Sequence, residues 1–168
     1  MLAADYILDM PMTQHYCCVT MIPDFVDIGG PWLVLPPGMH NATMEEVRVR
    51  FAISDRRKSL FSGFEDAVVS LRNAGCRAIL LDGSFVTAKP IPGDFDVCWE
   101  TAGVNATKLD PVFLDFSDGR KKQKERFGGE FFPADAFADT GHDFRFRDYF
   151  QIDKYTGEAK GIVCIRFS

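Results

Sequence analysis

Two short apolar runs joined through a glycine-serine pair constrain the fold of this chain most strongly. The first run covers residues 78–81 and is followed by Asp82 and the pair Gly83-Ser84. Nine residues later, Asp94 and Asp96 alternate with the apolar residues of the second run. Side chains on a strand point alternately to its two faces. A strand-turn-strand unit would therefore place both aspartates on one face and bury the apolar side chains between them on the other.

The paired aspartates predict a site for a divalent cation. Two carboxylates at this spacing repel each other unless a positive charge lies between them, and Mg²⁺ or Mn²⁺ prefers such oxygen ligands. Asp115, in the apolar run 112–116, is the candidate third acid, with Glu130 and Asp110 as competitors. Three carboxylates can hold two Mg²⁺ ions at the separation used for nucleotidyl transfer. The simpler interpretations are a capping or solvated role for the aspartate pair and, for Asp115, an ion pair with a basic side chain.

The glycine-serine pair predicts a phosphate site. Gly83 lets a ligand approach the backbone closely, and Ser84 offers a hydroxyl and an N–H group to a phosphate. The spacer, residues 85–93, contains two prolines and no arginine. The prolines favour a loop over a helix there, and Lys89 is the candidate cationic contact to the phosphates.

At these residues the chain resembles a known superfamily. The pattern Gly83-Ser84, nine residues, then Asp94-Phe95-Asp96-Val97 resembles the active-site motif of the DNA polymerase beta-like nucleotidyltransferases. The resemblance implies that the Gly-Ser pair binds the triphosphate, that the paired aspartates bind the metal ions and that Asp115 completes the site. It also implies a nucleotidyltransferase-like mixed sheet flanked by helices.

A wider likeness concerns domain organisation and function. Over roughly residues 21–168 the chain is similar to a small bacterial family with this fold, which makes Met21 the expected start of a single domain and residues 1–20 an N-terminal extension. The superfamily implies Mg²⁺-dependent transfer of a nucleoside monophosphate from an NTP to a hydroxyl of RNA or protein, with a possible partner protein in a toxin–antitoxin or defence system. The alternative is a catalytically weak nucleotide-binding or antitoxin-like interaction module with the same fold.

Composition and charge limit the classes of protein to which the chain can belong. A hydrophobic fraction of 46% and a charged fraction of 26% over 168 residues are typical of a globular chain. The net charge of −5 argues against general coating of DNA, which requires a basic surface. The basic run 120–126 is therefore predicted as a solvated helix face, with a phosphate or RNA contact as the alternative. Five cysteines without CxxC spacing and no bilayer-length apolar run predict a protein of the reducing cytoplasm, away from the membrane.

The hydrophobic pattern predicts interleaved helices and strands, and hence an α/β or α+β fold. Residues 22–40 should form an extended arm pinned by Trp32, Leu33 and Leu35, and Pro133 should enter a helix. Helices are predicted from Thr43 to about Phe51, from an Asp55 N-cap to the stop at Gly75, and from Ser117. Strands are predicted at residues 78–81, 112–116, 149–152 and 161–165, with a turn at Gly157.

Overall fold

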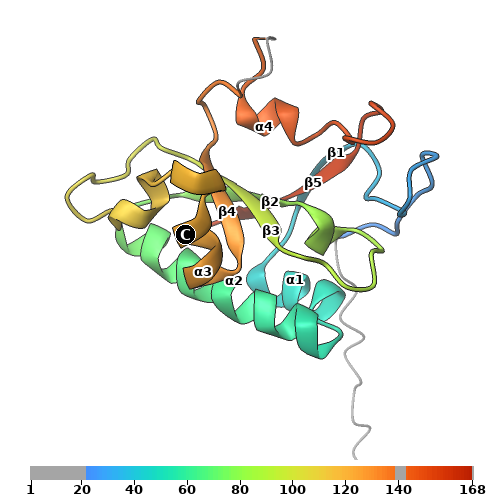
Figure 1. The fold of residues 1–168 in the computed structure, drawn as a ribbon, viewed down its shortest axis with the longest axis horizontal. Helices are drawn as coiled ribbons and strands as arrows, with labels where there is room; N and C mark the ends of the chain where they lie inside the picture. Colours follow the sequence, from blue (N-terminus) through green and yellow to red (C-terminus); the bar gives the residue numbers. More distant parts are fainter. Residues whose placement is uncertain (1–21, 139–142, 168) are drawn as a thin grey trace, which may run out of the picture.

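The computed structural model describes residues 22–138 and 143–167, which form a five-stranded mixed sheet with helices on both faces (Figure 1). The predicted N-terminal extension and its boundary at Met21 lie outside the described residues. The strand order is β1-β5-β2-β3-β4, where the outer pairs β1/β5 and β3/β4 are parallel and the pairs of β2 are antiparallel. This arrangement confirms the α/β or α+β class. The strands are β1 (Gly38–Asn41), β2 (Ala78–Asp82), β3 (Phe95–Trp99), β4 (Gly129–Pro133) and β5 (Gly161–Arg166).

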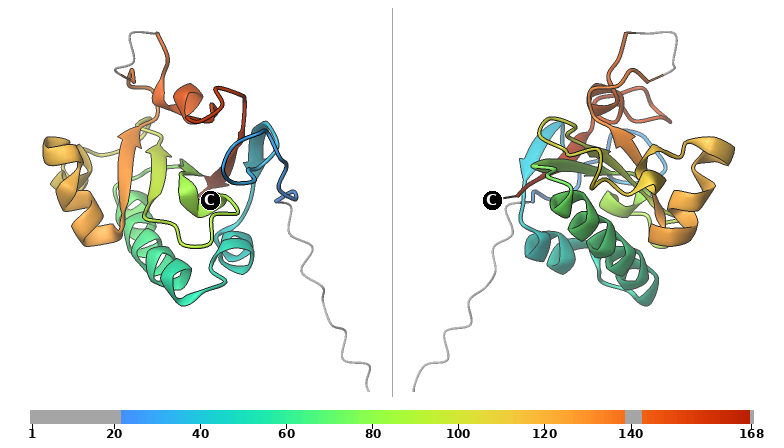
Figure 2. Two further views of the ribbon diagram at one scale, coloured as in Figure 1. Left: turned by 45° about the vertical axis from the view of Figure 1, so that its right-hand side comes forward. Right: turned by 90° about the vertical axis from the view of Figure 1, so that its left-hand side faces the viewer.

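The helices divide between the two faces of the sheet. As Figures 1 and 2 show, α1 and α2 lie on one face and the short α4 lies on the other. The third helix, α3, packs against α2 and β4. The helices are α1 (Met44–Phe51), α2 (Asp55–Asn73), α3 (Lys121–Phe127) and α4 (Phe146–Tyr149), with 3₁₀ turns η1 (Ser84–Val86), η2 (Pro111–Leu114) and η3 (Ser117–Gly119).

Local sequence signals set the ends of the first two helices. The predicted capping box at α1 is confirmed, because the Glu46 carboxylate accepts from the Thr43 N–H at 2.7 Å and the Thr43 hydroxyl accepts from the Glu46 N–H at 3.2 Å. At α2 the N-cap is Ser54, and the prediction of Asp55 is wrong by one residue. Gly75 follows the end of α2 with a φ of +99°, as a residue just beyond a helix C-cap often does.

The two faces of the sheet carry separate hydrophobic clusters. On the α1/α2 face, Phe64 and Leu71 of α2 pack with Phe95 and Val97 of β3 in the larger cluster. On the other face lies a smaller cluster, whose buried members are Leu80, Cys98, Phe132, Ala134, Ile162 and Cys164. Two aromatic side chains at α4, Phe146 and Phe150, pack against this cluster. Because Asp96 alternates with Phe95 and Val97, it projects to the face of the smaller cluster.

Two predicted strands are wrong. Residues 112–114 lie in the 3₁₀ turn η2 and Asp115 follows it, because Pro111 occupies the first position of the turn and the Asp110 carboxylate accepts from the Val112 N–H at 3.0 Å. Residues 149–152 contain the end of α4, and Ile152 alone pairs, in a bridge with Ala159. The predicted turn at Gly157 (φ +74°) and the strand after it are confirmed.

Strand β4 lies where a helix entry at Pro133 was predicted. Its two ends are a glycine and a proline, both unfavourable in strands. Gly129 is required there, since a Cβ atom would lie 2.3 Å from the Phe95 ring. In the N-terminal arm, Leu35 is buried as predicted, but Trp32 and Leu33 are exposed.

Three cysteines of the described residues, Cys76, Cys98 and Cys164, are buried and form no disulfide. Within the described ranges, no helix has the length and apolar character needed to span a bilayer.

Candidate functional site

Three acids from three neighbouring strands form a row on the face of the sheet that carries α4. Asp82 of β2 pairs with Asp96 of β3 in the antiparallel ladder, and Asp96 pairs with Glu130 of β4 in the parallel ladder. Paired residues of adjacent strands project to the same face, and adjacent strands lie roughly 5 Å apart. We call Asp82, Asp96 and Glu130 the acid row. Asp94, one residue before β3, adds a fourth carboxylate on the side of Asp96.

Burial and the neighbouring carboxylates raise the pKa of Asp96, in the middle of the acid row. Burial raises the pKa of Asp96 to about 8, and the carboxylates of Asp82, Asp94 and Glu130 contribute to the shift. Burial likewise raises the pKa of Asp82, against the lowering effect of Lys160. Asp96 therefore holds a proton at neutral pH unless additional positive charge reaches the row.

Two lysines neutralise the outer members of the row. The Lys160 ammonium forms a buried ion pair with Asp82. The Lys124 ammonium lies 2.5 Å from Glu130 Oε1 and 3.8 Å from Asp94 Oδ2. Among the described residues, Asp96 has no ion-pair partner of its own.

The Gly-Ser pair lies directly against Asp96. Gly83 has a φ of +81°, and a Cβ atom there would lie 2.6 Å from Asp96 Oδ2 and 2.9 Å from the Asp96 backbone nitrogen. Only glycine fits this approach and this backbone conformation without strain. Ser84 begins η1, and its hydroxyl donates to the Asp94 carbonyl at 3.3 Å. The predicted proximity of the Gly-Ser pair to the aspartates is confirmed.

The proline-containing spacer is fixed by two arginines at the start of α2. Arg57 is buried, and its guanidinium donates to three spacer carbonyls, those of Phe85 (2.7 Å), Thr87 (2.9 Å) and Lys89 (2.6 Å). Arg56 donates to the Pro92 carbonyl at 3.2 Å. The spacer therefore needs no arginine of its own. No local pattern indicates this role, because Arg56 and Arg57 occupy the first turn of an amphipathic helix.

A cavity of about 420 Å³ opens over Asp96. This volume falls in the range of small-molecule sites. Five of the six predicted site residues line it: Gly83, Ser84, Lys89, Asp94 and Asp96. Further lining comes from charged and aromatic side chains that belong to no sequence motif of the predicted site, among them Trp32, Asp82, Tyr149, Asp153, Tyr155 and Lys160.

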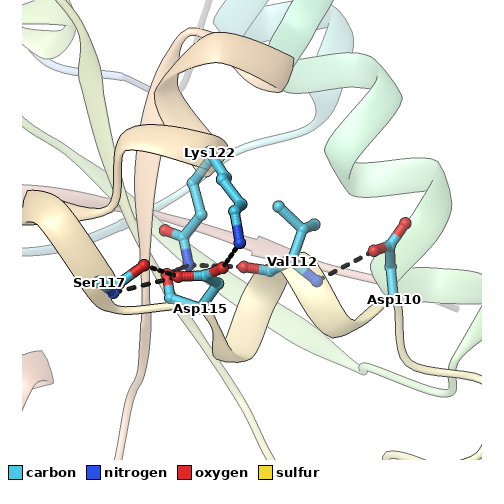
Figure 3. A network of polar contacts seen from close by, with 6 residues as sticks. Asp110, Val112, Asp115, Ser117 and Lys122 are labelled. Carbon is cyan, nitrogen blue, oxygen red and sulfur yellow. Dashed lines mark hydrogen bonds and ion pairs between the residues drawn. The ribbon is translucent and has the colours of Figure 1, made fainter.

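Asp115 does not belong to this site, and its predicted place on a neighbouring strand is wrong. It follows η2, where its carboxylate accepts from the Ser117 N–H at 3.1 Å and lies 2.6 Å from the Lys122 ammonium (Figure 3). The hydrogen bond from Lys122, followed by those from Ser117, lowers the pKa of Asp115 to about 2. Asp115 does not line the cavity. The simpler interpretation, an acid paired with a basic side chain, describes it correctly. Its competitor Glu130 pairs with Asp96 in the sheet but does not line the cavity either.

One of the known protein families matches residues 30–166, and its description is a family of unknown function, DUF6932. The chain belongs to the DUF6932 family. Neither the curated proteins nor the solved structures include a match to it. The matched residues of this DUF6932 chain contain the acid row, the Gly-Ser pair and both lysines that neutralise the row.

The basic run of the DUF6932 chain is largely paired within α3 and its surroundings. Lys122 pairs with Asp115, Lys124 with Glu130 and Arg126 with Asp110. The Arg120 guanidinium lies 3.9 Å from the centre of the Phe132 ring. The side chains of Lys122, Lys124 and Arg126 are 69%, 42% and 52% exposed, in agreement with the predicted solvated helix face.

The site of this DUF6932 chain suits a hard divalent cation in its chemistry. Asp94, Asp96 and Glu130 supply carboxylate oxygens, and their crowding destabilises the fully charged row. Within the described residues, however, no three potential ligands already converge in the manner of a metal site. Lys124 lies between Asp94 and Glu130 and neutralises both. An ion would have to displace this long, partly exposed side chain.

Proposed function

We propose that this chain is a Mg²⁺- or Mn²⁺-dependent nucleotidyltransferase that moves a nucleoside monophosphate from an NTP to an acceptor hydroxyl. The observation that carries the proposal is the position of the Gly83-Ser84 turn against Asp96, in a cavity that also exposes Asp94. A phosphate-sized backbone turn and a crowded carboxylate group thus share one cavity. This combination matches the requirements of metal-assisted phosphate chemistry.

The chain's own residues have separate roles in this proposal. Ser84 and the backbone at Gly83 bind the phosphates, and Lys89 and Lys160 add positive charge at the cavity wall. Asp94, Asp96 and Glu130 would hold the divalent ion, which supplies charge neutralisation at the reacting phosphate when it is bound. Asp96, whose pKa is raised to about 8, would have to be ionised to act as a ligand, and the positive charge of the ion would favour that form. Asp82 keeps the Lys160 ammonium in place.

The proposed reaction is a single displacement at phosphorus. The acceptor oxygen forms a bond to the α-phosphorus, and the bond to the oxygen that bridges the α- and β-phosphates breaks, which releases pyrophosphate. The acceptor proton passes to a carboxylate of the site. Glu130 takes the place that the sequence assigned to Asp115.

Two observations bear on context. The ion pairs of α3 favour a protein hydroxyl over RNA as the acceptor. The buried free cysteines favour a reducing compartment, so we place the activity in the cytoplasm, where a partner protein of a toxin–antitoxin or defence system would supply or present the acceptor.

A second candidate is the catalytically weak nucleotide-binding or antitoxin-like module. The contact of Lys124 with both Glu130 and Asp94 favours it, because these acids already have a counter-charge. A module of this kind would bind a nucleotide without consuming it.

Transfer of label from each NTP separates the two candidates. The protein is incubated with α-³²P-labelled NTPs, Mg²⁺ and a cell lysate, and labelled protein and RNA are resolved on gels. The nucleotidyltransferase predicts Mg²⁺-dependent labelling that Asp96→Asn abolishes and that the matched control Asp115→Asn retains. If the protein binds a nucleotide but neither transfers label nor releases pyrophosphate with any of the NTPs in the presence of Mg²⁺ and lysate, the result would support the module and contradict the enzyme.

A further inference from the structure

The cavity has a second wall that the proposed phosphate chemistry does not use. Five aromatic side chains line it, and we call them the aromatic wall: Trp32, Phe144, Tyr149, Phe150 and Tyr155. Trp32 is 38% exposed, Tyr149 39% and Tyr155 59%. Large apolar side chains with this much open surface can contact a ligand inside the cavity.

The aromatic wall comes from three segments held next to one another. Gly30 in the N-terminal arm lies against the 153–158 turn, where a Cβ atom on it would lie 3.6 Å from Thr156 Cγ2. The Asp153 carboxylate fixes this turn by accepting from the N–H groups of Tyr155 (3.0 Å) and Thr156 (2.9 Å). The arm is also tied to the spacer, because the Ala88 N–H donates to the Leu33 carbonyl at 2.9 Å. Trp32 is therefore held beside the phosphate side of the cavity.

Two charged side chains beside this wall are engaged with the protein itself. Asp153 is occupied by the N–H groups of its own turn. The Lys154 ammonium lies 5.1 Å from the centre of the Tyr155 ring. The wall itself offers aromatic surface, and its own polar groups are the Trp32 N–H and the Tyr149 and Tyr155 hydroxyls.

We propose that the aromatic wall binds the nucleobase of the NTP, while the Gly83-Ser84 turn, Lys89 and Lys160 take its triphosphate. This inference rests on the proposed function, which assigns the binding site of the phosphates. It adds a binding site for the base of the same NTP. The same cavity is lined by charged groups, the glycine turn and five aromatic rings, which are the groups that the charged and flat ends of a nucleotide require. Stacking on aromatic side chains is tolerant of base identity because every base has a π-face. The four common NTPs should therefore bind with similar affinities, within about fivefold of one another.

Calorimetric titration with two ligands tests this assignment. One ligand is a nonhydrolysable NTP analogue and the other is inorganic tripolyphosphate, which has no base; both are titrated in Mg²⁺. We expect the analogue to bind about tenfold more tightly than tripolyphosphate. Trp32→Ala should remove this advantage without changing the tripolyphosphate affinity, and Trp32→Phe should keep most of it. The control Phe116→Ala removes an aromatic ring of similar exposure, 45%, from outside the cavity and should change neither.

The outcomes separate the two proposals. Equal binding of the two ligands, or an analogue affinity that Trp32→Ala leaves unchanged, would overturn the base site and leave the phosphate site standing. Loss of acceptor labelling in Trp32→Ala with unchanged analogue binding would assign the wall to the acceptor and also overturn the inference. Failure of the wild-type protein to bind either ligand would overturn both the base site and the proposed function.

Discussion

Asp96 and Glu130 occupy paired positions of the parallel β3–β4 ladder, so their carboxylates project side by side from the same face of the sheet. Asp82 completes the row from the other side of Asp96. Acids from three strands rarely share a face without a compensating charge, because each raises the cost of ionising the others. Lys160 and Lys124 compensate the charges of Asp82 and Glu130, at the two ends of the row. Asp96, in the middle, retains its proton instead.

Stability should fall with rising pH through the titration of Asp96. Its pKa is about 3.8 as the ordinary value and about 8 in the folded protein, so between these values the folded state holds a proton that the unfolded state has lost. Each pH unit in this window should lower the free energy of unfolding by up to ~1.4 kcal/mol. Below pH 4 and above pH 8 this contribution becomes constant.

Urea unfolding of the wild type and Asp96→Asn from pH 5 to pH 8 measures this effect. The side chain at position 96 does not titrate in Asp96→Asn. The free energy of unfolding of this variant should therefore fall less steeply with rising pH and exceed that of the wild type at pH 8. Parallel curves for the two proteins would show that Asp96 is not the titrating group.

The Asp82–Lys160 ion pair should be costly to break from one side. Both side chains are buried, so Lys160→Met leaves an unpaired buried carboxylate and Asp82→Asn leaves an unpaired buried ammonium. Each single change should cost ~3–5 kcal/mol of unfolding free energy, and the double variant should recover a large part of that loss. Denaturant unfolding of the four proteins gives the coupling energy. Additive losses would contradict the pairing.

Arg57 should stabilise the spacer more than its position in the first turn of a helix suggests. Arg57→Met leaves the carbonyls of Phe85, Thr87 and Lys89 without their donor, which should cost ~2–4 kcal/mol. We expect weaker NTP binding as well, because the hydrogen bonds from Arg57 to these carbonyls position the loop after Ser84. The control Arg48→Met removes an exposed arginine of α1 and should leave the unfolding midpoint unchanged. Similar midpoints for the two variants would show that the buried contacts of Arg57 contribute nothing.

The sequence was most informative where structure is local. Gly83, Asp94 and Asp96 lie within one strand-turn-strand unit, and their spacing alone brings them together. Asp115 was misplaced because Pro111 and its capping acid turn an apolar run into a 3₁₀ turn, which periodicity does not reveal.

Long-range pairing was beyond the reach of local patterns. Asp82 and Lys160 are 78 residues apart, and only the order of the strands brings them into contact. Glu130 was recognised as a competitor for the third position, but its strand begins and ends in residues that disfavour strands. Its place in the row follows from the parallel pairing of β3 and β4, which the hydrophobic pattern does not specify.

Lys124 should compete with a divalent ion for the carboxylates of Asp94 and Glu130. Removing its ammonium in Lys124→Met should therefore raise the affinity for Mn²⁺, by about tenfold, and lower the Mn²⁺ concentration needed for nucleotide binding. The control Lys121→Met removes a neighbouring lysine of α3 that pairs with Glu125 and should have no such effect. Weaker Mn²⁺ binding in Lys124→Met would instead show that the lysine holds the site together.

The central claim, that Asp94, Asp96 and Glu130 bind a divalent cation, is tested most directly by titration of Mn²⁺ followed by electron paramagnetic resonance, with Mg²⁺ as competitor. The wild type and Asp115→Asn should bind Mn²⁺ with equal affinity and release it to Mg²⁺, whereas Asp96→Asn and Glu130→Gln should each lose at least about tenfold in affinity. Equal affinities in all four proteins, or no binding by the wild type with or without an NTP analogue, would contradict the account.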